Sequence, residues 1–308
     1  MLFCDKGILL MKLFEKVYIE LSDYCALSCG FCPSHTLSKR RGTMDLKLFE
    51  SICAQIQGKT RRVCLHLLGD PLSVQHFAMY VKILRKYHLK VDLVTTGLFL
   101  RKKHFELLLN EPFVQVSFSL SAFLANPHQF KKAHLKRILD FCAFNIHSQS
   151  PIFVNLRFHS NDILRRENYF VRMLNEIGAY FGFSNIDLKQ ERLKLGKKVF
   201  LNPTHSFDWE IQKDTFPPPY IVNNKSSIKP LCYGAQKQIG ILSNGELVPC
   251  CIDYNAQASF GNLKEQNLAD ILDSKAFIAF SLNLRQGNIP CELCQKCGYR
   301  LILQNNYN

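Results

Sequence analysis

The chain lacks any long apolar run, and stretches such as residues 8–11 are far shorter than the ~18–20 residues that span a bilayer. It shows no secretory signal, because that stretch is too short for one and no small-residue cleavage site follows it. It also has no internal repeats and no low-complexity tracts. With 47% hydrophobic and 21% charged residues, the composition excludes a disordered chain, a collagen and a coiled coil. We therefore expect a cytoplasmic globular protein.

Blocks of like charge are missing too. The 308 residues include 39 Lys and Arg against 25 Asp and Glu, a net charge of +14, but no run of five or six basic residues occurs. Such an excess is compatible with binding to nucleic acid or to an anionic substrate. Because the basic residues are dispersed, the charge by itself gives only weak support to a nucleic-acid partner.

Up to about residue 195, short apolar runs alternate with segments of helical period. The expected strands are Val17–Leu21, Val63–Leu68, Val91–Thr95, Val114–Leu120, Ile152–Phe158 and Ile186–Lys189. The expected helices are Leu46–Gln57, Val74–Tyr87, His104–Leu109, Leu135–His147 and Arg166–Phe181. Strands separated by helices form parallel βαβ units. Eight such units take about 250 residues, so six units over residues 1–195 predict an α/β fold with a partial (β/α)6 TIM-like barrel.

Residues 196–231 break this rhythm and are predicted to be a linker, since Pro217-Pro218-Pro219 cannot lie in a helix interior or a central strand. The sequence of residues 232–308 predicts a small cysteine-rich α+β domain. Its expected elements are a β-hairpin, Gln238–Leu242 and Glu246–Pro249 turning at Asn244-Gly245, and a helix over Leu268–Phe280.

Thirteen cysteines are the most informative feature of the composition. In a cytoplasmic protein they stay reduced, so clustered cysteines indicate a metal site rather than disulfides. Cys25, Cys29 and Cys32 lie within eight residues, directly after the first expected strand. Four thiolates close a [4Fe–4S] site, whereas three leave one iron open to a substrate or cofactor.

The spacing CxxxCxxC, with Phe31 between the last two cysteines, resembles the signature of the radical S-adenosylmethionine (SAM) superfamily. Further segments are similar to the superfamily's motifs in the same order. Residues 67–72 resemble the GGEPL motif, residues 94–97 the TNG turn and residues 118–122 the SLDA stretch. Asp70, Thr96 and Ser121 depart from those motifs, where Glu, Asn and Asp are usual.

The resemblance implies that Cys25, Cys29 and Cys32 ligate three irons of a [4Fe–4S] cluster and that SAM binds the fourth. The residues then expected to contact SAM are Phe31, Gly69, Asp70, Pro71, Ser119 and Arg157. Gly69 permits close approach of the main chain, and Arg157 can grip a carboxylate. Simpler roles stay open: Phe31 as a packing residue, Ser119 as a strand cap, and Arg157 as part of an ion pair or as a substrate ligand.

Six further cysteines lie in the last quarter of the chain, and their pattern resembles the SPASM/twitch auxiliary domain of many radical SAM enzymes. The resemblance implies one auxiliary [4Fe–4S] cluster. Its expected ligands are Cys232, Cys250, Cys291 and Cys294, with Cys297 as the rival for the last place. We expect Cys251 to point away as a structural thiol. A zinc ribbon is the alternative, because CxxC pairs suit tetrahedral zinc equally well.

The function implied is reductive cleavage of SAM at the first cluster, giving a 5′-deoxyadenosyl radical that abstracts hydrogen from a peptide or small-molecule substrate. The auxiliary cluster could accept the electron left after abstraction, making the net reaction an oxidation or a crosslinking, or it could bind substrate or relay electrons inward. A reductant such as flavodoxin or ferredoxin is the expected partner. No catalytic side chain is assigned beyond the cluster ligands. Two alternatives stay open: a radical SAM enzyme that modifies RNA, and a non-enzymatic iron–sulfur or zinc protein.

Overall fold

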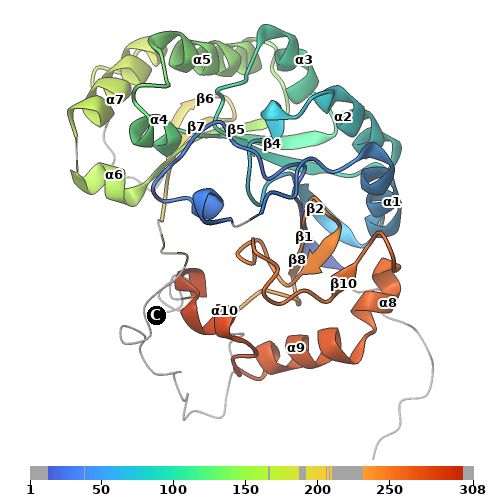
Figure 1. The fold of residues 1–308 in the computed structure, drawn as a ribbon. Helices are drawn as coiled ribbons and strands as arrows, with labels where there is room; N and C mark the ends of the chain where they lie inside the picture. The colour runs from blue at the N-terminus through green and yellow to red at the C-terminus, as the bar shows by residue number, and fades with distance from the viewer. Residues whose placement is uncertain are drawn as a thin grey trace, which may run out of the picture.

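One continuous ten-stranded sheet forms the frame of the molecule, curved into an open barrel with helices outside it (Figure 1). This computed structural model describes residues 13–37, 39–165, 167–186, 192–205, 207, 209 and 232–300, and within them the side chains of 163–165 are not described. The strand order is β10-β9-β8-β1-β2-β3-β4-β5-β7-β6.

Six strands in the middle of this sheet run parallel and form the barrel wall. They are β1 (Phe14–Ile19), β2 (Thr60–Cys64), β3 (Val91–Thr95), β4 (Phe113–Ser119), β5 (Phe153–His159) and β7 (Val199–Thr204). Parallel strands place all their C-terminal ends, and the loops that follow them, at one edge of the wall. The predicted partial (β/α)6 TIM-like barrel is therefore confirmed.

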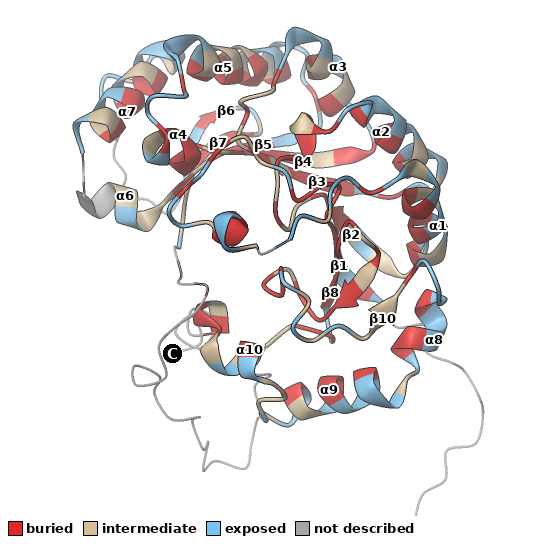
Figure 2. Ribbon diagram, in the orientation of Figure 1, coloured by how far each residue is buried: buried red, intermediate tan, exposed pale blue. Residues whose placement is uncertain are grey.

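Helices cover the outer face of the barrel, and their buried sides face the sheet (Figure 2). The longer ones are α1 (Leu46–Ile56), α2 (Phe77–Lys86), α5 (Lys132–His147) and α7 (Asn168–Phe181). Short turns of helix join them: α3 (Phe105–Leu108), α4 (Ser121–Ala125), α6 (Ser160–Arg165), η1 (Pro33–Thr36), η2 (Pro71–Ser73) and η3 (Lys102–His104). Helix α1 begins where the Asp45 carboxylate accepts hydrogen bonds from two main-chain N–H groups. None of the described helices has both the length and the apolar character needed to cross a bilayer.

The last barrel strand differs from the prediction. Most of the expected strand Ile186–Lys189 lies outside the described residues, and the sixth parallel strand is β7 instead. It forms an antiparallel pair with β6 (Leu193–Gly196). The barrel thus continues past residue 195 into the predicted linker, of which residues 210–231, with the three prolines, lie outside the described residues. Pro203 is tolerated in β7 because β6 pairs only as far as Leu201.

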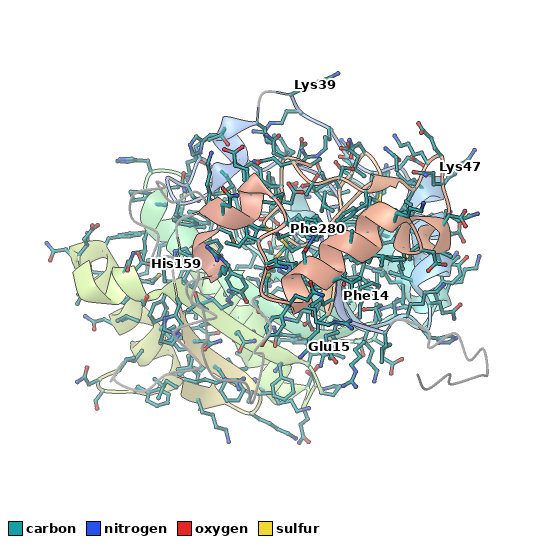
Figure 3. The ribbon with its side chains drawn as sticks, turned by 90° about the horizontal axis from the view of Figure 1, so that it is seen from below. Phe14, Glu15, Lys39, Lys47, His159 and Phe280 are labelled. Carbon is teal, nitrogen blue, oxygen red and sulfur yellow. The ribbon has the colours of Figure 1, made fainter. Side chains whose placement is uncertain are left out.

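The C-terminal segment extends the barrel sheet. The predicted hairpin is present as β8 (Gln238–Ile241) and β9 (Glu246–Val248), followed by β10 (Gly261–Asn262), and β8 pairs in parallel with β1. The single helix expected over 268–280 is two helices, α8 (Leu268–Leu272) and α9 (Lys275–Arg285), because Ser274 caps a new helix by accepting from the Phe277 N–H. Helix α10 (Glu292–Lys296) follows. Seen from below, α9 lies in front of the sheet with Phe280 along it (Figure 3).

A buried ion pair fastens this segment to the barrel. Glu20, directly after β1, is fully buried and binds Arg41 through both carboxylate oxygens, at 2.9 and 3.0 Å. The same carboxylate accepts hydrogen bonds from the main-chain N–H and the hydroxyl of Ser243, in the turn between β8 and β9, at 3.2 and 3.0 Å. One carboxylate therefore ties the hairpin turn to the loop that carries the first cysteine cluster.

Candidate active site

The first cysteine cluster lies in the loop that follows β1, at the C-terminal edge of the barrel. The loop is folded on itself, since the Cys32 N–H donates to the carbonyl of Cys29 at 3.0 Å. Asn126, which follows α4 and is almost fully buried, holds it from the side. Its amide nitrogen donates to the Cys29 sulfur at 3.1 Å, and its oxygen accepts from the Ser28 N–H at 3.3 Å. A hydrogen bond to a ligating sulfur is one of the features that tune an iron–sulfur cluster.

Burial dominates the acid–base chemistry of these thiols. It raises the pKa of Cys25 to about 11 and that of Cys29 to about 12, and the charges of neighbouring thiolates add to both increases. A negative charge on Cys32 raises the pKa of both Cys25 and Cys29, so the three sulfurs are close enough to interact electrostatically. Thiolates gathered in a poorly solvated loop need a positive partner, and the irons of a [4Fe–4S] cluster would meet that need.

No group of three or more His, Cys, Asp or Glu side chains in the described part of the chain is arranged to hold a single metal ion. A [4Fe–4S] cluster distributes its ligands over four separate irons, so its thiolates need not converge on one point. The donor set of the first loop, three thiols of which one accepts a side-chain N–H, is compatible with the cluster.

The motif after β2 packs directly against this loop. Gly69 has φ +71°, and a Cβ atom there would lie 2.1 Å from the carbonyl oxygen of Ser22 and 2.7 Å from that of Tyr24. The next N–H, that of Asp70, donates to the Tyr24 carbonyl at 2.9 Å. Glycine is thus required here because two backbones cross. Its expected approach to SAM stays a prediction.

The carboxylate of Asp70 is occupied by the protein itself. It is buried and accepts from the Leu72 N–H at 3.0 Å, from the Thr95 hydroxyl at 2.7 Å and from the Thr96 N–H at 3.0 Å, and the Thr96 hydroxyl is a further donor. Asp70 therefore joins the loops after β2 and β3. The main-chain N–H of Asp70 and the carbonyls of Asp70 and Pro71 also have partners, so within the described residues the main-chain groups of Gly69 remain for a ligand. Pro71 is buried at the start of η2.

Ser119 and Arg157 are neighbours, paired in register at the ends of β4 and β5. Burial lowers the pKa of Arg157, and no ion pair with it occurs within the described residues. The positive charge of Arg157 also acts on His66. Burial, together with the positive charges of Arg157 and Lys16, lowers the pKa of His66 to about 3, and its buried Nδ1 has no partner among the described residues. A half-buried guanidinium without a carboxylate partner among the described residues favours an anionic ligand.

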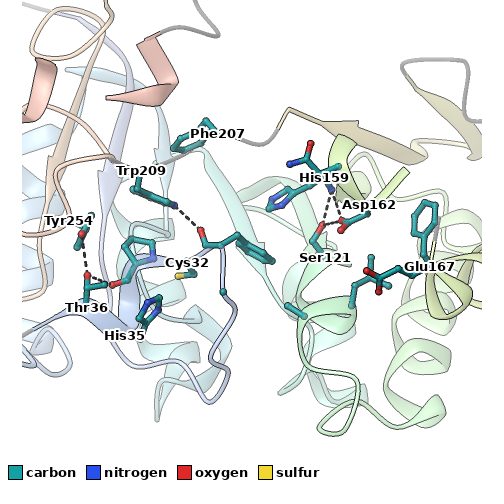
Figure 4. Close-up of a pocket in the computed structure, with 17 residues that line it drawn as sticks. Cys32, His35, Thr36, Ser121, His159, Asp162, Glu167, Phe207, Trp209 and Tyr254 are labelled. Carbon is teal, nitrogen blue, oxygen red and sulfur yellow. Dashed lines mark hydrogen bonds between the residues drawn. The ribbon is translucent and has the colours of Figure 1, made fainter. Parts of the chain in front are cut away.

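A cavity of about 740 Å³ opens beside the cysteine loop, and we call it the active-site cavity (Figure 4). Its walls include Phe31 and Cys32, the start of α4, the segment after β5, and Tyr254 of the C-terminal segment. Trp209 donates its indole N–H to the carbonyl of Phe31 at 3.0 Å. The Tyr254 hydroxyl lies 3.2 Å from that of Thr36, at the end of η1. Segments far apart in sequence thus converge on the loop that holds Cys32.

A small polar network lines the opposite wall of the active-site cavity. The Ser121 hydroxyl donates to Asp162 Oδ2 at 2.7 Å, and the main-chain N–H of His159 lies 2.7 Å from the Ser121 oxygen and 3.1 Å from the same carboxylate oxygen. The His159 ring meets Phe31 edge to face, with the ring centres 4.5 Å apart. Phe31 therefore has an aromatic partner in His159, and both side chains line the active-site cavity.

The structure brings the C-terminal cysteines together. Cys232 and Cys250 flank Gly234, where an added Cβ would lie 3.6 Å from an atom of each. The Sγ atoms of Cys291 and Cys294 are 3.6 Å apart. Cys297 packs with Cys250 in a small buried core, and burial raises the pKa of both. All five candidate ligands thus lie near one another, and their thiols interact electrostatically. The choice between Cys294 and Cys297 stays a prediction.

Two residues near Cys250 in the sequence, Cys251 and Asp253, make contacts within the protein. Cys251 accepts a hydrogen bond from the Tyr18 hydroxyl of β1, so its sulfur faces the barrel. Asp253 is fully buried and its carboxylate accepts from the N–H groups of Gln257 and Ala258, at 2.8 and 2.9 Å. Asp253 therefore shapes a turn.

Several residues of the site carry no signal that the sequence alone reveals. Asn126 makes a hydrogen bond to Cys29, which is 97 residues away in the sequence, and Trp209 makes one to Phe31, 178 residues away. Trp209 falls within the predicted linker, and His159 follows an expected strand without belonging to a motif. The only hint was that Trp209 is the single tryptophan of the chain.

Comparisons with known proteins agree with this architecture. A family model described as SPASM, an iron-sulfur cluster-binding domain, matches residues 232–298. A curated relative, the S-adenosyl-L-methionine-dependent 2-deoxy-scyllo-inosamine dehydrogenase of Niallia circulans, is 20% identical over 293 residues, which are 93% of each protein.

Solved structures with this fold belong to enzymes that were crystallised with SAM (AdoMet). BtrN with AdoMet and 2-DOIA superposes with a TM-score of 0.56 at 19% identity, covering 93% of both chains. The enzyme anSMEcpe with AdoMet gives 0.59 at 15%, covering 95% of this chain and 91% of the other. SuiB of Streptococcus suis gives 0.56 at 16%, covering 95% and 73%. Residues 232–298 thus match the SPASM domain, the chain shares the fold of these SAM-bound proteins, and its cysteine motif resembles that of the radical SAM superfamily.

Proposed function

We propose that this enzyme cleaves SAM reductively and oxidises or crosslinks a small molecule or peptide in the active-site cavity. The observation that carries the proposal is the loop of Cys25, Cys29 and Cys32, which lies at the C-terminal edge of the barrel and forms a wall of that cavity. When bound, the reduced cluster and SAM supply a 5′-deoxyadenosyl radical that takes a hydrogen atom from the substrate.

The chain's own residues hold and orient these groups. Cys25, Cys29 and Cys32 provide three thiolates, and Asn126 keeps Cys29 in place through its N–H donor. The main chain of residues 69–71, positioned by the buried carboxylate of Asp70, is proposed to contact the amino group of SAM. Ser119 and Arg157, adjacent on β4 and β5, are proposed to hold its ribose and carboxylate. Phe31, wedged against His159, shields the cluster from water.

In the SPASM domain, Cys232, Cys250, Cys291 and Cys294 are proposed to ligate one auxiliary [4Fe–4S] cluster, with Cys297 as the alternative to Cys294. Four protein thiolates close such a site, which favours electron transfer over substrate binding. Held by these thiolates, such a cluster would supply an acceptor for the electron that a net oxidation releases. A flavodoxin or ferredoxin is the proposed reductant of the first cluster.

Two substrate classes remain in view. The curated relative, matched over 93% of each protein, is named a 2-deoxy-scyllo-inosamine dehydrogenase. SuiB was crystallised with its precursor peptide SuiA, and anSMEcpe, matched over 92% of this chain and 88% of the other, with a peptide. The sequence match to the dehydrogenase supports oxidation of a small molecule as the first choice. RNA modification rests only on dispersed positive charge.

The test is anaerobic incubation of reconstituted protein with dithionite and SAM, measuring 5′-deoxyadenosine. We expect about eight irons per chain from the two proposed clusters. Cys29→Ala should abolish 5′-deoxyadenosine formation and lower the iron content. Cys250→Ala should lower substrate turnover while part of the SAM cleavage persists. Full SAM cleavage by Cys29→Ala, or bound zinc without iron, would contradict the proposal.

A further inference from the structure

A continuous line of hydrogen bonds joins the first cysteine loop to the SPASM domain (Figure 4). The Thr36 hydroxyl donates to the carbonyl of Pro33 at 2.8 Å, and Pro33 directly follows Cys32. The Tyr254 hydroxyl lies 3.2 Å from the Thr36 oxygen. Because the single hydroxyl proton of Thr36 is already used, Tyr254 is the donor in this second bond. The line therefore runs from Tyr254 through Thr36 to the residue after Cys32.

Tyr254 is held in place from the side of the auxiliary site. It lies four residues after Cys250, and the intervening Asp253 N–H donates to the Cys250 carbonyl at 3.3 Å. Its own N–H donates to the Ile252 carbonyl at 2.8 Å. The Tyr254 side chain is buried, and the Trp209 ring packs perpendicular to it with the ring centres 5.5 Å apart. The position of the Tyr254 hydroxyl therefore depends on where the main chain of Cys250 lies.

The other end of the line lies at Cys32. Cys32 immediately precedes η1, and Pro33 and Thr36 are the first and last residues of that turn of helix. A second contact acts on the same stretch, since the Trp209 N–H donates to the carbonyl of Phe31 at 3.0 Å. Displacing a group by about 1 Å in an active site can cost a factor of about 10² in rate. A small shift of Cys32 should therefore have a measurable effect.

The two hydroxyls have one other evident use, which is direct contact with a substrate. Both Thr36 and Tyr254 border the active-site cavity. The Tyr254 proton is taken by Thr36, however, and the Thr36 proton by Pro33, so neither hydroxyl has a donor left for a ligand. This pattern favours a role in holding the two segments together.

We propose that Tyr254 is a positioning residue that couples the two cysteine sites. Its hydroxyl, acting through Thr36, holds Cys32 in the geometry that SAM binding requires. A cluster ligated by Cys250 would in turn fix the position of Tyr254. Filling the auxiliary site should then raise the affinity of the first site for SAM. This inference rests on the proposed function, because it takes Cys32 and Cys250 as ligands of the two clusters.

The experiment measures SAM binding to the reconstituted protein by calorimetry, without oxygen or reductant, together with the iron content. Tyr254→Phe is the decisive variant, because it removes one oxygen and keeps the ring that packs against Trp209. We expect it to weaken SAM binding about fivefold or more, the lower end of typical coupling between sites, with the iron content of the wild type. Thr36→Val should have the same effect. Thr36→Ser, which keeps the hydroxyl, should bind SAM like the wild type.

Two comparisons show whether these effects share one route. The double variant Tyr254→Phe/Thr36→Val should bind SAM no more weakly than either single variant, since both remove the same bond. Cys250→Ala should weaken SAM binding to a similar degree, and adding Tyr254→Phe to it should change little. Cys250→Ser, which nearly keeps the size of the side chain, replaces it if the alanine variant fails to fold.

Tyr180→Phe is the matched control. It also loses a tyrosine hydroxyl bond, to Asp140 at 2.8 Å, but at an exposed position between two outer helices. Its SAM affinity and iron content should equal those of the wild type.

Wild-type affinity in Tyr254→Phe would overturn the inference, and so would effects of the two single variants that add up in the double variant. Unchanged SAM affinity in the Cys250 variant would refute the link to the auxiliary site. Loss of iron from Tyr254→Phe would also count against it, because the residue would then maintain a cluster rather than its geometry towards SAM. Failure of the proposed function looks different: the wild type itself would neither bind SAM nor form 5′-deoxyadenosine.

Discussion

Replacing Arg41 by methionine should destabilise the whole molecule, because it leaves the Glu20 carboxylate charged and buried without a cation. The Glu20 side chain is 0% exposed and that of Arg41 is 11% exposed. Loss of one partner from a buried ion pair typically costs about 3–5 kcal/mol. The other donors to Glu20, the two groups of Ser243 and the more distant N–H of Leu68 at 3.4 Å, are neutral and compensate only part of this.

The measurement is urea unfolding of the reconstituted protein without oxygen, with the free energy of unfolding extrapolated to water. Arg61→Met is the matched control. Arg61 pairs with Glu15 at 3.5 Å, but these side chains are 63% and 50% exposed, so the change should cost about 0–1 kcal/mol. The double variant Glu20→Gln/Arg41→Met should cost less than Arg41→Met alone, since a neutral amide needs no counter-ion.

The outcome also tests whether the SPASM hairpin is fastened at this point. Ser243→Ala should cost about 1 kcal/mol, because it removes one hydroxyl donor from the buried carboxylate. If Arg41→Met costs no more than Arg61→Met, then Glu20 is hydrated or protonated in solution, and the ion pair does not join the two parts of the chain. A double variant as unstable as the single one would equally contradict the reasoning.

Three further predictions concern the loops around the clusters. Gly69→Ala should destabilise the protein by about 2 kcal/mol or more and lower its iron content. The reason is that a Cβ atom at φ +71° would collide with a main-chain carbonyl of the cysteine loop. An unchanged melting temperature would contradict this. Asn126→Leu should keep the iron but lower the reduction potential of the first cluster, measured by a potentiometric titration, since the N–H donor to the Cys29 sulfur is lost. The lowered pKa of His66, about 3, means that the unfolded chain binds an extra proton below pH 6.5, so stability should fall by about 1 kcal/mol from pH 7 to 5.5 in urea unfolding. His66→Gln should reduce that fall, whereas His128→Gln, at an exposed position, should not.

The barrel was predictable because its signals are local. Strand β3 has the bounds Val91–Thr95 that its apolar run predicts, and α1 begins at Leu46, as predicted, with Asp45 as its cap. Each such element is defined by residues within a few positions of one another, so periodicity and capping suffice. The hairpin β8–β9 belongs to the same class, because Asn244-Gly245 specifies its turn.

Where the prediction failed, a competing local signal or a distant contact decided the structure. A single helix over 268–280 ignored Ser274, whose hydroxyl accepts from an N–H three residues later and starts a second helix. Strand β7 lies at the start of the predicted linker, because that prediction rests on Pro217-Pro218-Pro219 further along the chain. Its hydrogen-bonded pairing with β5, which lies about 45 residues earlier in the chain, stabilises the strand. The sequence of the segment alone does not reveal that pairing.

The side chain of Asp70 has a role that the motif does not state. Its carboxylate lies between the loops after β2 and β3 and accepts hydrogen bonds from donors of the chain, while the expected contact of its main chain with SAM stays a prediction. A sequence motif records that a residue type is needed at a position, but it does not say whether a ligand or a neighbouring loop requires it. The partners Thr95 and Thr96 lie only 25 and 26 positions away, yet no pattern in the sequence pairs them with Asp70.

The parallel pairing of β8 with β1 bears on how the two cysteine sites can influence each other. The first cysteine cluster lies in the loop that follows β1. Cys250 follows β9, the strand next to β8 in the same sheet. Main-chain hydrogen bonds therefore fix the spacing of the two sites, whatever path residues 210–231 take. Tyr254, four residues after Cys250, reaches Thr36 at the end of the first loop. The SPASM domain is thus a continuation of the barrel wall, and residues of both parts line the active-site cavity.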